Sequence, residues 1–372
     1  MPYRPKDIYR GRRKFRVPLN IFLFVLSFAV FGSIALFYGL RLFVVYVNSG
    51  VSLQLPWERE AQTEEEAVIA TPEPTFEPVQ VQVVWEDPDF SDVDLGGWED
   101  LAPIKARYFP LAEVTNPSSL GAAVSAVQTG DYTTAIFEMK ARSGQLAWPS
   151  SYPTALSYAT AGTTDVTDAI AELHAAGKTV AAQISCFADE LLAERNWTVT
   201  FMLNGRAYAD GDGIYWLDPY NRTVRAYITG LVEELAAMGF DEIILADLYH
   251  PVQEGLSYSS SGTLQTPPNP VVAVCQMGRR IVETLQDTGV AVSARINGTS
   301  LRLGMGAQTG QDIGIFWRLF ARLYCPSDYG IVESDMELAV ESMNRGDANI
   351  RFVPICPFVP EDVESYVLVT SW

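Results

Sequence analysis

The sequence predicts a (β/α)8 TIM-like barrel, and three observations support this. Eight short apolar runs alternate with stretches of helical periodicity, the pattern of βα units around a parallel sheet. The helical stretches end at glycines. The repeating part covers roughly 270 residues, the usual size of such a barrel. The predicted strands are 105–109, 133–139, 179–185, 241–247, 290–296, 319–325, 351–356 and 365–370.

Two of the intervening helices have clear signals. In residues 165–177 the apolar side chains recur on one helical face, and Gly177 ends the pattern. Residues 221–239 repeat this arrangement with Gly239 as the stop, and Asp218 is expected to cap the start.

An open, doubly wound sheet is the alternative fold. No glycine-rich phosphate loop follows the first predicted strand, so the usual ligand of that fold has no site. The interval between the last two strands is short, which predicts that the seventh helix is lost or reduced to a turn.

The N-terminal part is organised differently. Residues 1–18 form a basic tail, and residues 19–47 form an apolar run that predicts a single transmembrane helix, since about 20 apolar residues cross a bilayer. Residues 48–95 are acidic and contain prolines, which predicts an extended linker, and residues 96–372 form the barrel domain. A cleaved signal peptide fits less well, because its apolar core is shorter.

The distribution of charge predicts the topology and excludes one class of ligand. Residues 1–50 carry eight Lys/Arg and one Asp, a net +7, which leaves −26 for the rest of a chain whose total is −19. Cations before the span place the N-terminus in the cytoplasm and the barrel outside, anchored to the cell membrane. A domain so acidic is unsuited to nucleic acid, whose phosphates require cations.

The four cysteines, Cys186, Cys275, Cys325 and Cys356, lack the paired spacing of a zinc site. Cys325 and Cys356 lie on neighbouring predicted strands and could form a disulfide outside the cell. Buried free thiols are the equally open alternative.

Acidic, polar and aromatic residues gather at the carboxyl ends of the predicted strands and on the following loops, where functional groups of a parallel barrel lie. The candidate catalytic residues are Glu138, Asp247 and Asp328. The candidate substrate-binding residues are Lys140, Trp148, Gln183, Tyr208, Trp216, Tyr249, His250, Arg295 and Tyr324.

This composition points to carbohydrate chemistry. Glycoside cleavage uses one carboxyl to protonate the leaving oxygen and a second as nucleophile or base, while flat rings stack on sugars. The chain has two histidines, no Cys–His pairing and no Ser-His-Asp grouping, so we expect no metal and no cofactor. Structural roles remain open: Glu138 could pair with Lys140 in a filled interior, and Asp247 could face the outer helices.

Several segments resemble a bacterial family of glycosyl hydrolase domains, distant relatives of the α-amylase-like barrels. The segment "WLDPYNRTVRAYITGLVEELAAMGFDEIILADLYHP" is similar to a family pattern in which W-x-(D/N)-P-Y leads through a helix to "GFDEIQFDYIRFP". "AIFEMKARSGQLAWPS", "VAVSARING", "GQDI" and "LYCPSDYG" are similar to further family segments, in the same order. The resemblance covers residues 104–357 and implies a barrel that hydrolyses glycosides.

The same resemblance implies altered working positions. The family's strand-four Asp falls on Ala246, while Asp247 stands where the family has an aromatic residue. A shift of one residue in a strand sends a side chain to the opposite face, so Asp247 replaces that acid only if the strand end is bulged or twisted. The strand-five Asp becomes Arg295, and strand two keeps an acid as Glu138.

Two functions therefore remain open. The first is a membrane-anchored, extracytoplasmic glycoside hydrolase-like protein that binds or cleaves cell-surface or cell-wall carbohydrate. The second is a catalytically inactive barrel that serves as a carbohydrate-binding or protein-interaction scaffold at the cell envelope. The hydrolase requires two carboxyl groups that face one cleft.

Overall fold

The computed structural model describes residues 44–47, 50–53, 101–258 and 269–369. The chain divides into two compact units, Met1–Val83 and Val84–Trp372. In the first unit, strands β1 (Val44–Val47) and β2 (Gly50–Leu53) pair in antiparallel fashion.

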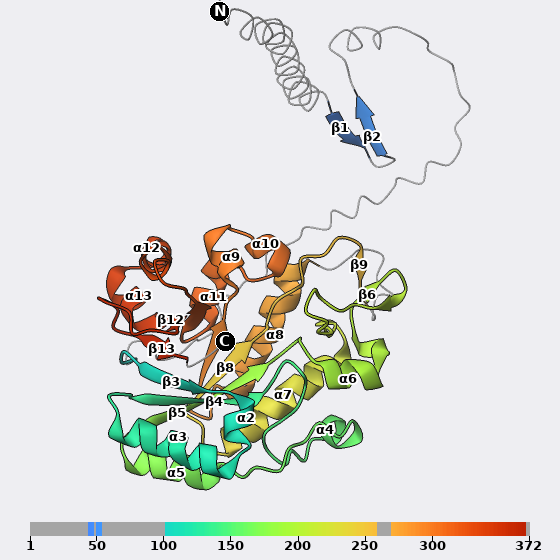
Figure 1. The fold of residues 1–372 in the computed structure, drawn as a ribbon. Helices are drawn as coiled ribbons and strands as arrows, with labels where there is room; N and C mark the ends of the chain where they lie inside the picture. The colour runs from blue at the N-terminus through green and yellow to red at the C-terminus, as the bar shows by residue number, and fades with distance from the viewer. Residues whose placement is uncertain (1–43, 48–49, 54–100, 259–268, 370–372) are drawn as a thin grey trace, which may run out of the picture. The chain divides into compact units, whose positions relative to one another are not determined.

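The second unit contains a closed barrel of eight parallel strands (Figure 1). The strand order is β10-β11-β12-β13-β3-β4-β5-β8, so each strand pairs with its neighbours along the chain and the last returns to the first. This confirms the predicted (β/α)8 barrel and excludes the open sheet. The strands are β3 (Lys105–Phe109), β4 (Thr134–Lys140), β5 (Thr179–Ser185), β8 (Glu242–Ala246), β10 (Ala291–Arg295), β11 (Leu323–Pro326), β12 (Phe352–Cys356) and β13 (Tyr366–Leu368).

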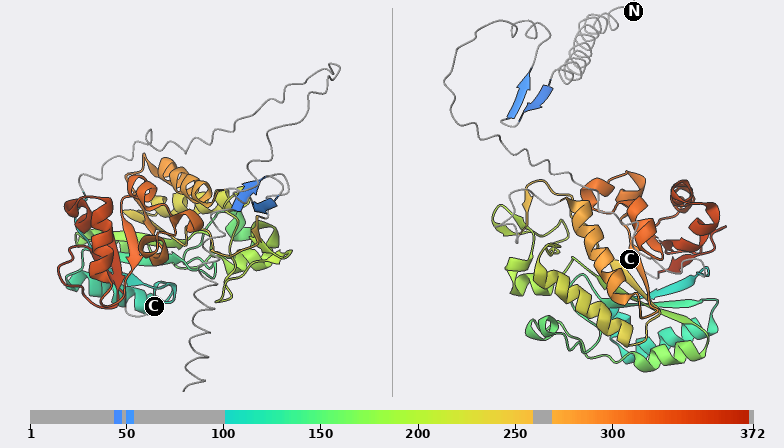
Figure 2. Two further views of the ribbon diagram at one scale, coloured as in Figure 1. Left: turned by 90° about the horizontal axis from the view of Figure 1, so that it is seen from above. Right: turned by 180° about the vertical axis from the view of Figure 1, so that it is seen from behind.

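Helices connect the strands on the outside of the barrel. Figures 1 and 2 show α3 and α5 side by side along the outer face of β3, β4 and β5. No helix lies between β12 and β13, as the short interval predicted. The helices are α2 (Leu111–Val114), α3 (Pro117–Thr129), α4 (Pro153–Ser157), α5 (Thr167–Ala175), α6 (Glu190–Arg195), α7 (Arg222–Ala237), α8 (Pro270–Leu285), α9 (Gly298–Arg302), α10 (Gly306–Thr309), α11 (Ile313–Leu319), α12 (Val332–Ser342) and α13 (Arg345–Arg351), with a 3-10 turn at Trp197–Val199.

The start of α7 differs from the expectation in one detail. Asn221, not Asp218, is the N-cap, and its side chain accepts a hydrogen bond from the Thr223 amide at 2.9 Å. Asp218 lies one turn earlier and accepts from the Tyr220 amide at 2.8 Å. It therefore shapes the turn that precedes the helix.

The barrel interior and the layer between strands and helices form two separate apolar clusters. Inside, Ile136, Ala181 and Ile244 pack against residues from the opposite wall. At the amino end of the strands, the interior is polar: Arg322 contacts Glu242 at 3.0 Å, and the Tyr324 hydroxyl donates to Glu242 at 2.8 Å. This end of the barrel is therefore closed by a buried polar network, in which Arg322 Nε is left without a hydrogen-bond partner among the described residues.

A small three-stranded antiparallel sheet lies outside the barrel, in the order β7-β6-β9. Its strands are β6 (Met202–Leu203), β7 (Arg206–Ala207) and β9 (Leu256–Ser257). The first two belong to the long excursion between β5 and α7, and the third follows β8. The excursion thus folds back onto the loop after β8, beside the carboxyl ends of the strands.

The predicted tail (1–18) lies outside the described residues, as does the predicted anchor (19–47) except for Val44–Val47, which form β1. Of the predicted linker (48–95), only Gly50–Leu53 is described, as β2. Among the helices that the structure describes, none has both the length and the apolar character that a bilayer crossing needs.

The four cysteines are buried free thiols. Cys325 pairs in register with Pro354, and Pro326 with Ile355, so Cys356 lies beyond the position opposite Cys325. Burial raises the pKa of the Cys325 and Cys356 thiols to about 12. The structure therefore supports the thiol alternative over the disulfide.

Candidate active site

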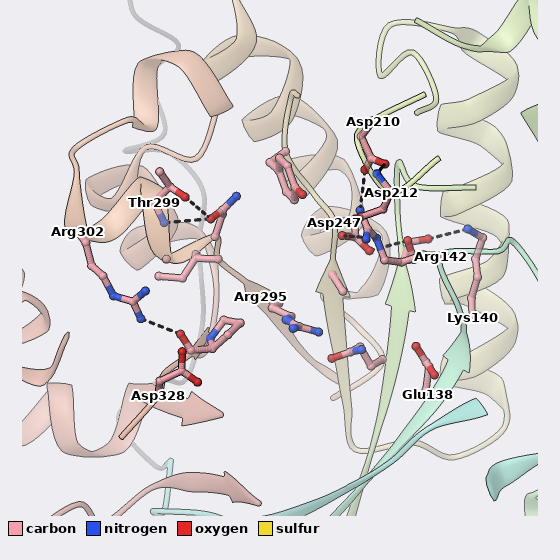
Figure 3. A pocket seen from close by; sticks show the side chains of 18 residues that line it. Glu138, Lys140, Arg142, Asp210, Asp212, Asp247, Arg295, Thr299, Arg302 and Asp328 are labelled. Carbon is pink, nitrogen blue, oxygen red and sulfur yellow. Dashed lines mark hydrogen bonds and ion pairs between the residues drawn. The ribbon is translucent and has the colours of Figure 1, made fainter. Parts of the chain in front are cut away.

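A cavity of about 670 Å³ opens at the carboxyl ends of the barrel strands (Figure 3). This is the end at which parallel barrels carry their functional groups. Its wall contains carboxylates, guanidinium groups and hydroxyls in place of the apolar residues that fill the interior below. The lining residues are Glu138, Lys140, Arg142, Gln183, Ser185, Asp210, Asp212, Ala246, Asp247, Tyr249, Arg295, Ile296, Asn297, Gly298, Thr299, Arg302, Pro326 and Asp328.

Glu138 stands on the inner face of β4, two residues above Ile136 in the barrel core. Its Oε2 accepts a hydrogen bond from the Leu111 amide at 2.8 Å, which fixes the carboxyl to the segment after β3. Burial, and then the negative charge of Glu138, raise the pKa of the neighbouring Tyr108 hydroxyl well above its usual range. Glu138 is therefore held at the floor of the cavity by its surroundings, and it does not pair with Lys140.

Asp247 reaches the cavity through an unusual backbone conformation. Ile244 and Ala246 of β8 face inward, so strict alternation would turn Asp247 toward the outer helices. Its φ of 50° lies in the left-handed region, which breaks the alternation at the strand end. The side chain then lines the cavity, and the twist that the sequence required of this strand end is present.

The Asp247 carboxylate has two partners there. Ser185 Oγ donates to its Oδ2 at 2.8 Å, and Arg142 Nε lies 3.4 Å from its Oδ1. The side chain is 15% exposed, so these contacts act in a partly desolvated setting. They orient the carboxylate and keep it on the cavity wall.

Arg142, which the sequence did not single out, connects Asp247 to the excursion after β5. Its guanidinium also contacts Asp210 at 3.2 Å and lies 5.6 Å from the Trp216 ring centre. Burial lowers the pKa of Arg142, but the charges of Asp247 and its neighbours outweigh that effect and raise it. The guanidinium therefore stays charged between the two acids.

Lys140 has a structural position, contrary to the expected contact with substrate. A register shift between Glu138 and Lys140 marks a bulge in β4. The Lys140 side chain is fully buried, and its ammonium contacts Asp189 at 2.9 Å and the carbonyl oxygens of Ser185 and Ala188 at 2.8 and 3.4 Å. Two hydrogen bonds and one ion pair within the protein therefore hold its ammonium group.

Three predicted aromatic residues do not present a free ring to the cavity. Trp148 is buried and its Nε1 donates to Glu234 at 2.9 Å, outside the cavity lining. Trp216 is also buried; it donates to Asp210 at 2.9 Å and packs against Tyr249 at 4.7 Å between ring centres. Tyr324 belongs to the network at the opposite end of the barrel. Burial of large rings in the packed layers explains all three.

Two further predicted residues lie beside the cavity without lining it. Tyr208 lies in the excursion after β5 and packs on the outer core. His250 Nδ1 donates a hydrogen bond to the Pro251 carbonyl oxygen at 2.7 Å, and the centre of its ring lies 4.7 Å from that of Phe201. By contrast, Gln183, Tyr249 and Arg295 line the cavity, and Gln183 Nε2 donates to the Tyr108 hydroxyl at 3.2 Å.

Asp328, the third candidate acid, lies exposed at the rim. Its neighbour Tyr329 is 86% exposed and its ring meets Phe358 edge-on at 5.3 Å. An exposed aromatic pair next to a lining residue is a suitable surface for a sugar ring. The turn-like sequence around Tyr329 gave no signal for this role.

Metal ions require a set of side-chain ligands gathered in one place. In the described part of the chain, no group of three or more His, Cys, Asp or Glu side chains has an arrangement that could hold an ion. The cavity lining offers instead five carboxylates, Glu138 and Asp247 among them, several guanidinium groups and neutral polar groups, which suit proton transfer and recognition of a polar ligand.

Comparison with known proteins gives a family and a fold. Residues 106–331 match the family described as "Putative glycosyl hydrolase domain". The glycoside hydrolase domain of PgaB (BpsB) from Bordetella bronchiseptica has a similar structure, with a TM-score of 0.53 and 13% identity, covering 72% of this chain and 94% of that one. The structure of a hypothetical protein from Ruminiclostridium thermocellum gives a TM-score of 0.44 at 20% identity, and the match covers 50% of this chain and 96% of that one. No curated protein matches the chain.

Proposed function

We propose that this chain, which belongs to the family described as "Putative glycosyl hydrolase domain", binds a cell-surface or cell-wall carbohydrate in its barrel cavity and hydrolyses a glycosidic bond there. The single observation that carries the proposal is that Glu138 and Asp247, from separate strands, line the same cavity. Two carboxyl groups facing one cleft are the minimum equipment for this reaction.

The two acids differ in ways that suit different roles. Glu138 lies on β4 and Asp247 directly follows β8, with β5 between these strands, so their backbones stand about 10 Å apart across the barrel wall. Asp247 is ion-paired to Arg142, which favours it as the charged nucleophile or base. Glu138, which the Leu111 amide holds through Oε2, is then assigned the second role, that of proton donor to the leaving oxygen.

Membrane attachment is the second part of the proposal. The apolar run 19–47 would cross the membrane once, with residues 1–18 in the cytoplasm and the linker 48–95 holding the barrel outside. The support is the sequence itself. Protease added to intact cells should cut within the linker and release the barrel, whereas protection of the linker would overturn this topology.

Hydrolysis is tested by product release from isolated cell-wall glycans. The full chain should release oligosaccharides, and Glu138→Gln and Asp247→Asn should each reduce the rate by about a hundredfold or more, because each removes a proton-transferring or charged group. Glu337→Gln, the same chemical change at an exposed position of α12, should leave the rate unchanged. Full turnover by Glu138→Gln would remove this residue from the mechanism.

One observation favours the second candidate, binding without hydrolysis. Ala246 lines the cavity at the inward-facing end of β8, so the regular inner face of this strand contributes no acid to the cavity. A chain that retains glycans but releases no product would support a binding scaffold.

A further inference from the structure

Arg295 stands at the carboxyl end of β10 with its guanidinium directed into the cavity (Figure 3). Ala294 pairs with Leu245, which places Arg295 beside Ala246 on the neighbouring strand, about 5 Å away. Because Ala246 has only a methyl group, the space next to the guanidinium is open to the cavity. Arg295 is thus an accessible cation on the inner wall.

The other cations of the cavity wall are already neutralised. Each of them contacts a carboxylate of the protein, whereas no carboxylate of the described residues lies within ion-pair distance of Arg295. The neutralised pairs are Lys140–Asp189 at 2.9 Å, Arg142–Asp247 at 3.4 Å, Arg142–Asp210 at 3.2 Å and Arg302–Asp335 at 2.6 Å. Arg295 is therefore the lining cation whose charge is left for a ligand.

Two neutral hydroxyls, those of Tyr108 and Tyr249, lie near Arg295, and the carboxylates of Glu138 and Asp247 act on the same hydroxyls without forming an ion pair with Arg295. Its charge acts on the hydroxyls of Tyr108 and Tyr249, lowering pKa values that burial raises above the usual range. Gln183 completes this part of the wall through its bond to Tyr108. A partly desolvated guanidinium with no carboxylate paired to it is costly unless an anion binds to it.

We propose that the carbohydrate bound in this cavity is an acidic one, and that Arg295 binds the carboxylate of a uronic-acid-type sugar residue. This inference rests on the proposed function and specifies its substrate class. A planar carboxylate fits the two parallel N–H donors of a guanidinium. The negative charge of Asp247 disfavours the same anion at the other side of the cavity, so the ligand is oriented with its charge at Arg295 and its neutral part between the two acids.

The test compares one glycan pool in two forms. Fragments of envelope glycan from the cells that make the protein are used natively and after carbodiimide activation and borohydride reduction, which converts carboxylates to alcohols and leaves the chain intact. Retention by the immobilised full chain is measured for both pools. We expect at least tenfold stronger retention of the native pool, with uronic acids enriched in the retained fraction.

Arg295→Gln should abolish this preference, so that retention of the native pool falls to that of the reduced pool, because it removes the charge that binds the carboxylate. Arg295→Lys keeps the charge but loses the two parallel donors, so this variant should show a reduced preference for the native pool. Arg345→Gln, an exposed arginine outside the cavity, is the matched control and should behave as wild type. Thermal melting of each variant verifies that the fold is intact.

Each outcome decides a separate claim. Three outcomes would overturn the role of Arg295 and leave glycan binding standing. The wild type could retain both pools equally, or its retention could survive carboxyl reduction but be lost on desulfation or dephosphorylation. The third is an equal loss of both pools in Arg295→Gln. Retention of neither pool would overturn the proposed function together with this inference.

Discussion

Arg142 Nε lies 3.4 Å from Asp247 Oδ1, and this contact joins the segment after β4 to the segment after β8 across the mouth of the barrel. It exists because Asp247 leaves the alternation of its strand with a φ of 50°. The position of one carboxylate in the cavity therefore depends on a backbone conformation that few residue types tolerate.

Substitutions at Asp247 should separate chemistry from stability. Asn tolerates the left-handed region, so Asp247→Asn should change the unfolding free energy by less than about 1 kcal/mol. Val is β-branched and tolerates this conformation poorly. Asp247→Val should therefore lower the unfolding free energy by about 1–3 kcal/mol more than Asp247→Asn does, through backbone strain. Urea denaturation of both variants measures the difference. Equal stabilities would show that the strand end relaxes to an ordinary conformation.

Substitutions at two glycines test the close contact between the backbone of Gly144 and the side chain of Asp189. Gly144 and Gly177 both have positive φ, but a Cβ on Gly144 would lie 2.0 Å from Asp189 Oδ1, whereas one on Gly177 would meet nothing within 4 Å. Gly177→Ala should lower the unfolding free energy by about 1 kcal/mol, because alanine is strained at this positive φ. Gly144→Ala should cost about 1–3 kcal/mol more, because it displaces a buried carboxylate. Similar thermal shifts for both variants would contradict the packing described.

The buried pair of Lys140 and Asp189 should show strong coupling. Both side chains are fully buried, and Asp189 Oδ1 also caps α6 through the Leu192 amide at 2.8 Å. Lys140→Met leaves the carboxylate without its counter-charge and should cost about 3–5 kcal/mol. Asp189→Asn keeps the cap but loses the charge.

A double-mutant cycle by urea denaturation isolates this interaction. The double variant Lys140→Met/Asp189→Asn should be more stable than the sum of the single losses predicts, by about 1–3 kcal/mol, since neither charge is then left alone. Additive losses would mean that the two side chains act independently.

Much of the fold could be predicted because its signals are local. The eight strands occur where apolar runs were bounded by helical patterns, and α5 and α7 end beside the glycines expected to stop them. The cap of α7 was misplaced because Asp218 and Asn221 are both good caps, and the choice depends on the turn between them.

The candidate site could be predicted only in part. Glu138, Gln183 and Arg295 are strand-end residues, and the rule for parallel barrels found their place on the cavity wall. Trp148 and Trp216 were expected to face a ligand, but whether a ring packs inward depends on tertiary contacts that no local pattern encodes. Arg142 and Arg302 were missed because their roles come from partners distant in sequence.

The four thiols should be inaccessible in the folded chain. All are buried, and burial raises their pKa, that of Cys275 to about 12. A thiol of this kind reacts slowly, because the thiolate is the reactive form. An aromatic disulfide reagent at pH 8 should therefore modify almost none of them in the native protein and four in guanidinium chloride. Fewer than four in unfolded, unreduced protein would reveal a disulfide.

His250 should make the fold sensitive to acid. Burial lowers its pKa below the ordinary value, and this effect outweighs the hydrogen bond to Pro251 and the charge of Asp218, which both act upward. The unfolded chain, with a histidine pKa of about 6.5, then binds the proton first. Stability is complete above that pH and falls as the pH drops through 6.5 toward the folded pKa, by at most about 1.4 kcal/mol per pH unit for one proton.

Urea denaturation between pH 7.5 and 5 measures this loss. In His250→Gln the side chain cannot titrate but can still donate to Pro251, so the part of the pH dependence that begins near 6.5 should disappear. His174→Gln removes the other histidine, which contacts Asp241 on the outer surface, and should leave the acid loss due to His250 in place. If His250→Gln loses stability with falling pH as steeply as the wild type, the ring is charged in the folded protein and its packing against Phe201 must be looser than described.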